Sequence, residues 1–115
     1  MAITEAFANS EAVGATEHSM PADATYSSGS PQTDDGIYQI FLDVSDMIAT
    51  DELQIRVYEK VNSGGTQRIV YEAYLFGVQG HVWVSPSLIL MHGWDATLDA
   101  LAGTITVIWS IRKVA

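Results

Sequence analysis

The side chains best suited to acid–base or metal chemistry in this sequence are its three histidines, His18, His81 and His92. None of them has a second His or a Glu four residues later, so neither a helical zinc motif nor facial-triad spacing is present. The most site-like segment is 92–95, where a His and an Asp flank a tight turn beside an indole and could line a binding pocket. We favour the simpler interpretation, in which the histidine is exposed, the glycine takes a positive φ and the tryptophan belongs to the core.

The acidic residues offer no better signal for a metal or an active site. Asp34-Asp35-Gly36 does not match the calcium-loop pattern, and adjacent aspartates before a strand are typical turn formers. The sequence has no GxSxG elbow and no phosphate-binding glycine loop. The acids crowd the N-terminal half, and so small a domain has little room for a cleft flanked by two catalytic carboxylates. We therefore expect no enzymatic activity, no cofactor and no metal.

The composition describes one weakly charged, acidic domain. The chain has 115 residues, of which 48% are hydrophobic and 17% charged, with no cysteine and a net charge of −9. Without cysteine there is no disulfide, thiol nucleophile or iron–sulfur cluster. The acidity disfavours nucleic acid as a partner. Because there is no long apolar run and no basic leader, we expect neither a membrane span nor a signal peptide.

The charge is distributed unevenly along the chain. Residues 1–55 contain ten acids and no Lys or Arg, whereas residues 56–115 contain five bases and four acids, so the two halves carry −10 and +1. An acidic segment beside a near-neutral body is consistent with docking onto a basic surface. The alternative is that the acids only keep the domain soluble.

From residue 36 onward, the pattern is that of short strands separated by turns. Seven segments have this character: 37–44, 53–58, 69–76, 81–84, 87–92, 94–98 and 105–112. No helical stripe persists there over three turns. Seven or eight short strands predict an all-β fold, an antiparallel, jelly-roll-like β-sandwich, with a small barrel as the alternative.

The side chains also decide the register of the hairpin that joins the second and third of these segments. A two-residue turn would place Glu72 opposite Val57, among apolar residues. A three-residue loop ending at Gly65, in the left-handed position, instead pairs Val57 with Tyr71 and Arg56 with Glu72. We expect the second register, because a slip of one residue would exchange the two faces.

This register and the alternation of the other strands predict the core. It contains Ile40, Leu42, Leu53, Ile55, Val57, Val107, Trp109 and Ile111, faced by Tyr71, Ala73 and Leu75.

Residues 1–35 differ from the domain at 36–115 and are expected to form a partly extended N-terminal arm. The arm is rich in Ala, Ser, Thr, Gly and Pro, with scattered large apolar residues that are too widely spaced for a core of their own. We expect these to make contacts between chains: Ile3, Phe7, Val13, Met20 and Tyr26. A closed oligomer would let each arm reach a neighbour. The alternative is that about ten residues are disordered and the rest folds back on its own domain.

Several aromatic residues suggest a second kind of binding surface. Five of them could form a platform on which a sugar ring stacks: Tyr58, Tyr71, Tyr74, Trp83 and Trp94. In the alternative, Trp94 and Trp109 lie in the core and the tyrosines cover sheet edges.

Several strings of the sequence carry a family resemblance. They are IRVYEK at 55–60, TQR at 66–68, WVSPS at 83–87, MHGWDATL at 91–98, AGT at 102–104 and WSIR at 109–112. Over roughly residues 36–115, this sequence resembles small virion proteins of tailed bacteriophages.

The resemblance implies a structural role, that of a head decoration (cement) protein on the capsid exterior. Its partners would be the major capsid protein and further copies of itself, arranged as a trimer, with no nucleic acid and no membrane. No residue role carries over from the family. The alternative is a phage tail or adsorption module that binds host glycan through an aromatic face.

Overall fold

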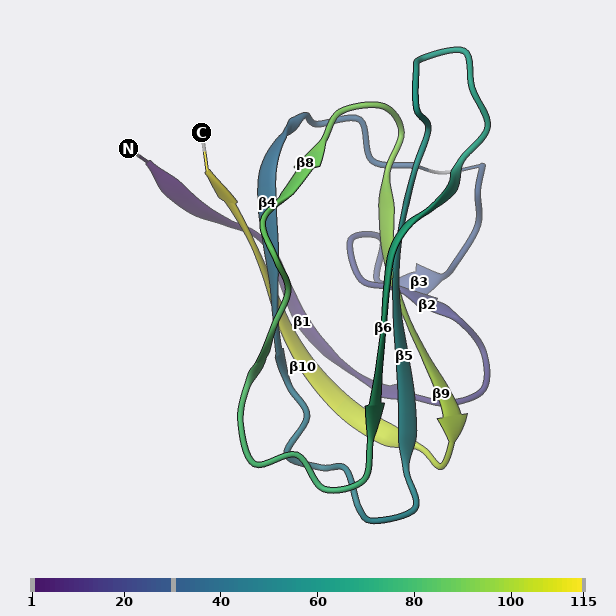
Figure 1. Ribbon diagram of the computed structural model, residues 1–115, viewed down its shortest axis with the longest axis vertical. Coiled ribbons are helices and arrows are strands. Elements are labelled where there is room, and N and C mark those ends of the chain that lie inside the picture. Colours follow the sequence, from purple (N-terminus) through teal and green to yellow (C-terminus); the bar gives the residue numbers. More distant parts are fainter. Residues whose placement is uncertain (1, 30, 115) are drawn as a thin grey trace.

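The computed structural model describes residues 2–29 and 31–114, which form ten β-strands and no helix (Figure 1). In chain order the strands are β1 (Ile3–Val13), β2 (His18–Ser19), β3 (Ala24–Thr25), β4 (Gly36–Asp43), β5 (Glu52–Glu59), β6 (Arg68–Phe76), β7 (Trp83–Val84), β8 (Leu88–Leu90), β9 (Asp95–Ala102) and β10 (Ile105–Val114). None of the described residues belongs to a helix that could cross a membrane.

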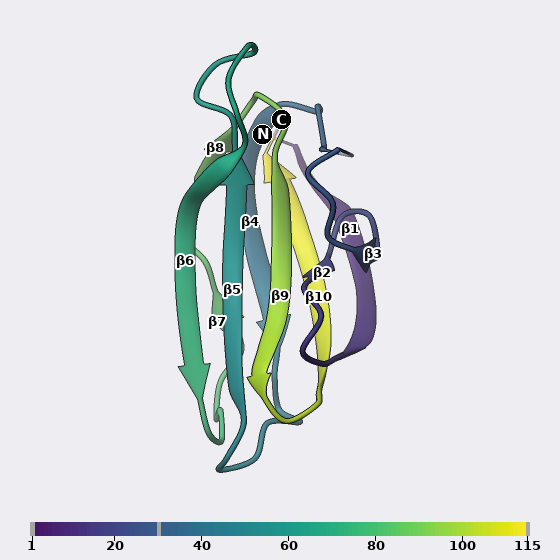
Figure 2. The same ribbon diagram turned by 90° about the vertical axis from the view of Figure 1, so that its right-hand side faces the viewer.

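The strands form two antiparallel sheets of five strands each. Sheet A has the order β1-β10-β4-β7, with β8 also paired to β4, and sheet B has the order β3-β2-β9-β5-β6. Figure 2 shows β6, β5 and β9 of sheet B in front of β4, β10 and β1 of sheet A. The predicted fold is confirmed: the chain is an antiparallel, jelly-roll-like β-sandwich.

The core lies between the sheets, where the alternation of side chains predicts it. Each strand presents every second residue to the facing sheet, because successive side chains of a strand point to opposite faces. All eight predicted core residues are at most 2% exposed: Ile40, Leu42, Leu53, Ile55, Val57, Val107, Trp109 and Ile111. Tyr71, Ala73 and Leu75 are partly buried against them.

The predicted register of the β5–β6 hairpin is also confirmed, but the feature that sets it differs from the expectation. Val57 pairs with Tyr71 and Arg56 with Glu72. The pairing then shifts through a bulge at the next position, so that the strands end at Glu59 and Arg68 and an eight-residue loop, 60–67, joins them. Gly65 does not take the left-handed conformation expected of it. The bulge therefore shifts the register by one residue, which is the shift that the three-residue loop was expected to produce.

Residues before 36, expected to form a partly extended arm, supply strands to both sheets. β1 pairs with β10 along its length, and β2 pairs with β9. The accessible surface of 6007 Å² is close to the roughly 6,200 Å² of a compact monomer of this mass. An edge strand needs only its backbone ladder and a few inward anchors, so a segment poor in apolar residues suffices for β1.

Candidate functional site

The five apolar residues predicted to contact another chain lie in different environments. Val13 and Met20 are buried in the core. Phe7 packs edge-on against a core tryptophan, and Tyr26 stacks on the ring of a tyrosine in β5, 4.6 Å away. Ile3 is 66% exposed. Of these five residues, only Ile3 therefore leaves most of its surface exposed to solvent.

The outer face of sheet A gathers other exposed apolar side chains beside Ile3. Strand register aligns Ile3, Val114, Ile37 and Ile89 in one row across β1, β10, β4 and β8. Ile37 is 41% and Ile89 79% exposed. We call these four residues the apolar row. Apolar side chains that line up across strands in this way form a continuous strip rather than isolated surface residues.

A second row lies on the same face, beyond the outward positions of Arg112 and Gln39. Ala8, Ser110, Phe41 and Val84 align across β1, β10, β4 and β7. The Arg112 guanidinium lies 3.8 Å from the centre of the Phe41 ring, in a cation–π contact. The outer face of sheet A thus carries two rows with apolar side chains, separated by a polar row of Glu5, Arg112 and Gln39, in which the guanidinium lies against the Phe41 ring.

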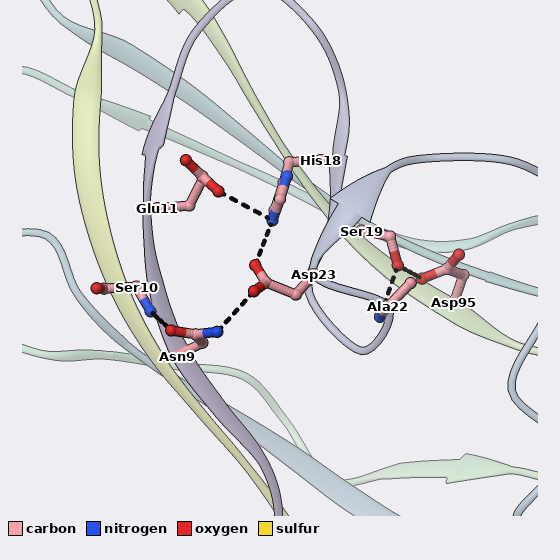
Figure 3. Close-up of polar contacts among 8 residues, drawn as sticks. All are labelled: Asn9, Ser10, Glu11, His18, Ser19, Ala22, Asp23 and Asp95. Carbon is pink, nitrogen blue, oxygen red and sulfur yellow. Dashed lines mark hydrogen bonds and ion pairs between the residues drawn. The ribbon is translucent and has the colours of Figure 1, made fainter.

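The cluster best suited to metal ligation lies at the opposite side of this sheet, between the layers. Glu11, His18 and Asp23 each direct one ligand-type atom to a common point, and these atoms lie within 4.8 Å of one another. His18 Nε2 is 3.0 Å from Asp23 Oδ1 and 3.9 Å from Glu11 Oε2 (Figure 3). Imidazole nitrogen with two carboxylates is a donor set that first-row dications accept.

The fold places these three side chains from both sheets. Glu11 pairs with Val107 and therefore points inward from the edge strand β1 of sheet A. His18 pairs with Leu98 and points inward from β2 of sheet B, where its ring lies 5.6 Å from that of Trp109. The cluster consequently bridges the two layers at the open edge of the sandwich.

Asp23 is fixed by its backbone and by a second hydrogen bond. It is the one non-glycine residue among those described with a positive φ, 51°. Its Oδ2 accepts a hydrogen bond of 2.6 Å from Asn9 Nδ2, which leaves Oδ1 directed at His18 (Figure 3). A hollow of about 450 Å³, lined by residues 11–18 and 23–25, opens beside the cluster.

A separate polar network holds the segment after β1 onto the outer face of sheet B. Glu17 Oε2 accepts hydrogen bonds from Tyr58 OH at 2.7 Å and from Thr97 Oγ1 at 2.5 Å. Burial, with the nearby Glu17 carboxylate as a further cause, raises the pKa of Tyr58 to about 12. The Tyr58 hydroxyl and the Glu17 carboxylate thus hold the segment after β1 against sheet B. Tyr26 stacks on Tyr58 as part of the same contact.

The tetrapeptide at 92–95 does not converge into a site. Gly93 has a positive φ of 55° and Trp94 is fully buried, as the simpler interpretation predicted. His92 is partly rather than fully exposed, and its backbone NH donates to Glu59. Asp95 is buried on β9, where it accepts a hydrogen bond of 2.6 Å from Ser19 Oγ. Histidine and aspartate therefore serve different local contacts.

Asp34 acts as a structural anchor before β4. Its carboxylate accepts from Lys113 Nζ at 2.9 Å, and its backbone oxygen accepts from Tyr38 OH and Trp94 Nε1. The hydrogen bond from Lys113 is the main reason why the pKa of Asp34 is lowered.

The five aromatic residues of the suggested sugar platform do not share a surface. Trp94 is fully buried and Tyr58 nearly so. Tyr71 and Trp83 stack at 6.5 Å and pair with inward-facing residues, so they close the gap between β6 and β7. Tyr74 remains exposed and stacks on Phe76, also exposed, on the edge strand β6.

Comparison with known proteins yields no family assignment. No family model and no curated protein matches this chain. Among solved structures, the chain is similar to the Eiger TNF of S. frugiperda, with a TM-score of 0.45 and 12% identity over 97% of this chain and 88% of that one. It is also similar to a xylan-binding domain from CBM 22, with a TM-score of 0.41 and 12% identity over 86% of this chain and 64% of that one.

Sequence reasoning did not find the Glu11–His18–Asp23 cluster or the apolar row. The three members of the cluster are separated by seven and five residues, which matches no local ligand motif. The register of β1 and β2 and the turn between β2 and β3 bring them together. A polar residue at an inward position of β1 was the available signal, but it requires knowing that β1 is a strand.

Proposed function

We propose that this chain is a non-enzymatic virion structural protein, a capsid decoration protein that binds the major capsid protein on the exterior of the head. The observation that carries the proposal is the apolar row on the outer face of sheet A, because monomeric domains rarely leave a contiguous apolar strip in water. The binding surface we propose is therefore this face, in place of an N-terminal arm that β1 engages within its own chain.

The charge of the chain supports a protein surface as the partner. A net charge of −9 favours approach to a basic surface and disfavours nucleic acid. The apolar row supplies apolar surface that docking would bury, while Arg112, already stacked on Phe41, supplies a fixed cation beside the row. A shallow, mixed surface of this kind suits docking onto a folded protein rather than enclosing a small molecule.

The proposal is tested by binding to capsids that lack this chain. Ile37→Asp and Ile89→Asp each place a charge in the apolar row, and we expect either to reduce binding at least tenfold, because the charge would lose its water on docking. Val61→Asp is the matched control, since Val61 is 85% exposed but lies in the β5–β6 loop, away from sheet A. Equal binding by all three variants would contradict the proposed surface.

Electron microscopy of intact particles tests the location independently. Antibody labelling on the head lattice is the expected result, and the symmetry of the density would decide whether copies form a trimer. Labelling on the tail would favour the second candidate, an adsorption module that binds host glycan. The stacked, exposed pair Tyr74 and Phe76 is the surface that would serve it.

A further inference from the structure

We propose that Glu11, His18 and Asp23 form a binding site for a first-row transition-metal dication that ties the two sheets together at the open edge of the sandwich. The site is independent of the capsid-binding face, which lies on the outside of sheet A. Its chemistry is set by one imidazole nitrogen and two carboxylates, a mixture that suits Zn²⁺, Mn²⁺ or Co²⁺ rather than the all-oxygen shells of Ca²⁺ and Mg²⁺.

The interatomic distances place two of the three ligands for ligation and leave the third within reach. Imidazole nitrogen and carboxylate oxygen bind such ions at about 2.0–2.2 Å, so two ligands at an angle of about 90–110° lie roughly 2.8–3.6 Å apart. His18 Nε2 and Asp23 Oδ1, 3.0 Å apart, already satisfy this range. Glu11 Oε2 lies 3.9 Å from Nε2 and within 4.8 Å of the Asp23 ligand atom, so it has to move inward by up to about 1 Å to meet the same range. The Glu11 side chain is 43% exposed and free to make that adjustment.

The charges of the cluster leave it incompletely neutralised without a cation. Two carboxylates approach a single imidazole nitrogen, which has one position for a proton and so serves one of them at hydrogen-bond distance. Among the described residues, the ion pairs of Glu11 and Asp23 involve only His18, and residues 1–55 contain no Lys or Arg. A dication at the common point would balance both carboxylates.

The surroundings have the features of a supported ligand set. Asn9 Nδ2 holds the second oxygen of Asp23 at 2.6 Å, as outer partners do for metal-binding carboxylates. The His18 ring is oriented against Trp109 and its side chain is 12% exposed. The hollow of about 450 Å³ next to the cluster leaves room for water molecules to complete the coordination shell.

The inference predicts a stabilising effect, because the ion would join β1 of sheet A to the β2–β3 hairpin of sheet B. An ion that binds only the folded chain stabilises it by mass action. At a free Zn²⁺ concentration about 100 times the dissociation constant, we expect the melting temperature of chelator-treated protein to rise by roughly 5–10 °C.

Titration of the purified, chelator-treated chain at pH 7.5 tests the site. Calorimetry with Zn²⁺ should show one ion per chain, and Co²⁺ should give visible absorption of a nitrogen- and oxygen-ligated ion. Glu11→Gln, His18→Gln and Asp23→Asn should each weaken Zn²⁺ affinity on the order of tenfold or more, since even outer partners contribute that much. Asparagine tolerates a positive φ, so Asp23→Asn keeps the backbone while removing the charge.

Two matched controls separate this site from adventitious binding. The double variant His81→Asn, His92→Asn removes the other two histidines. Glu5→Gln makes the same change as Glu11→Gln, but on the outer side of β1. Both controls should bind Zn²⁺ as the wild-type chain does. Absence of saturable binding in the wild-type chain would overturn the inference. So would unchanged affinity in the Glu11 and Asp23 variants, or loss of affinity in the histidine control. None of these measurements requires a capsid.

Discussion

Asp95 is a carboxylate held almost entirely out of water, at 2% exposure. Its Oδ1 accepts hydrogen bonds from Ser19 Oγ at 2.6 Å and from the backbone NH of Ala96 at 2.8 Å. Burial nevertheless outweighs these bonds and raises the pKa of Asp95 above its ordinary value, with nearby Glu17 adding to the effect. The folded chain therefore binds this proton more tightly than the unfolded chain does.

A change of Asp95 to Asn should alter the pH dependence of stability. Because the folded pKa is raised, the stability that protonation gives is complete below the unfolded pKa of about 3.9 and is lost as the pH rises through the folded pKa. Asn cannot ionise and escapes this loss. The melting temperature of Asp95→Asn minus that of wild type should therefore increase from pH 3.5 to pH 7, whatever the packing cost of the amide. A difference that stays constant over this range would contradict the assignment.

At the scale of elements, the strands that the sequence predicted share one property: their inward positions are uniformly apolar. β4 and β10 alternate between buried and more exposed positions, and β5 and β9 place apolar residues at every inward position although several of their outward positions are buried too. β1 breaks the pattern with Asn9 and Glu11 at inward positions, where they face the polar cluster rather than the core. Glu11 of the candidate metal site and Asn9, which supports it, therefore concealed the strand that carries them both.

Tertiary register explains the remaining features that the sequence could not supply. The apolar row exists only because Ile3, Ile37 and Ile89 align across strands that are far apart in the chain. Each of them is an ordinary surface residue in its own segment. The β5–β6 register was predictable because one charged pair, Arg56 with Glu72, and one apolar face agreed on it.

The turn between β9 and β10 depends on one glycine. Gly103 has a φ of 83°, and a Cβ at this position would collide with the carboxylate of Asp51. That carboxylate is buried and accepts a hydrogen bond from the backbone NH of Ile48. Moving it aside would therefore weaken this hydrogen bond. We expect Gly103→Ala to destabilise the chain by about 2 kcal/mol, combining backbone strain with the displaced side chain.

Gly14→Ala is the control for this prediction. Gly14 has no positive φ, and a Cβ there would meet nothing within 4 Å. Its replacement should be neutral or stabilise the chain by up to about 1 kcal/mol, since alanine reduces the entropy of the unfolded state. Urea denaturation of both variants measures the difference. Equal stability of the two would show that the β9–β10 turn tolerates a side chain.

At the scale of the whole molecule, the pairing of β1 with β10 makes the N-terminal segment part of its own sandwich rather than of a neighbouring chain. It pairs with β10 from Ile3↔Val114 to Val13↔Ile105, interrupted by one register shift. Val13 enters the core, and the connection to β2 continues directly into sheet B. Without β1, β10 would become an edge strand with unpaired backbone groups, a surface prone to pair with other chains.

Hydrogen exchange on the intact chain tests this arrangement without a truncation that would unfold it. Amides of β1 and β10 that bond to each other within one chain open only by local or global unfolding of that chain, so their protection should be the same at every protein concentration. If β1 instead paired with a second copy, dilution would release it. Protection in residues 3–13 and 105–114 would then fall together, while β5 and β9 stayed protected.

Mass spectrometry of the N- and C-terminal peptides measures the exchange. The expected result is slow exchange in β1 and β10 at both low and high protein concentration. A concentration-dependent loss confined to those two strands would mean that β1 is exchanged between chains and that an oligomer forms through it.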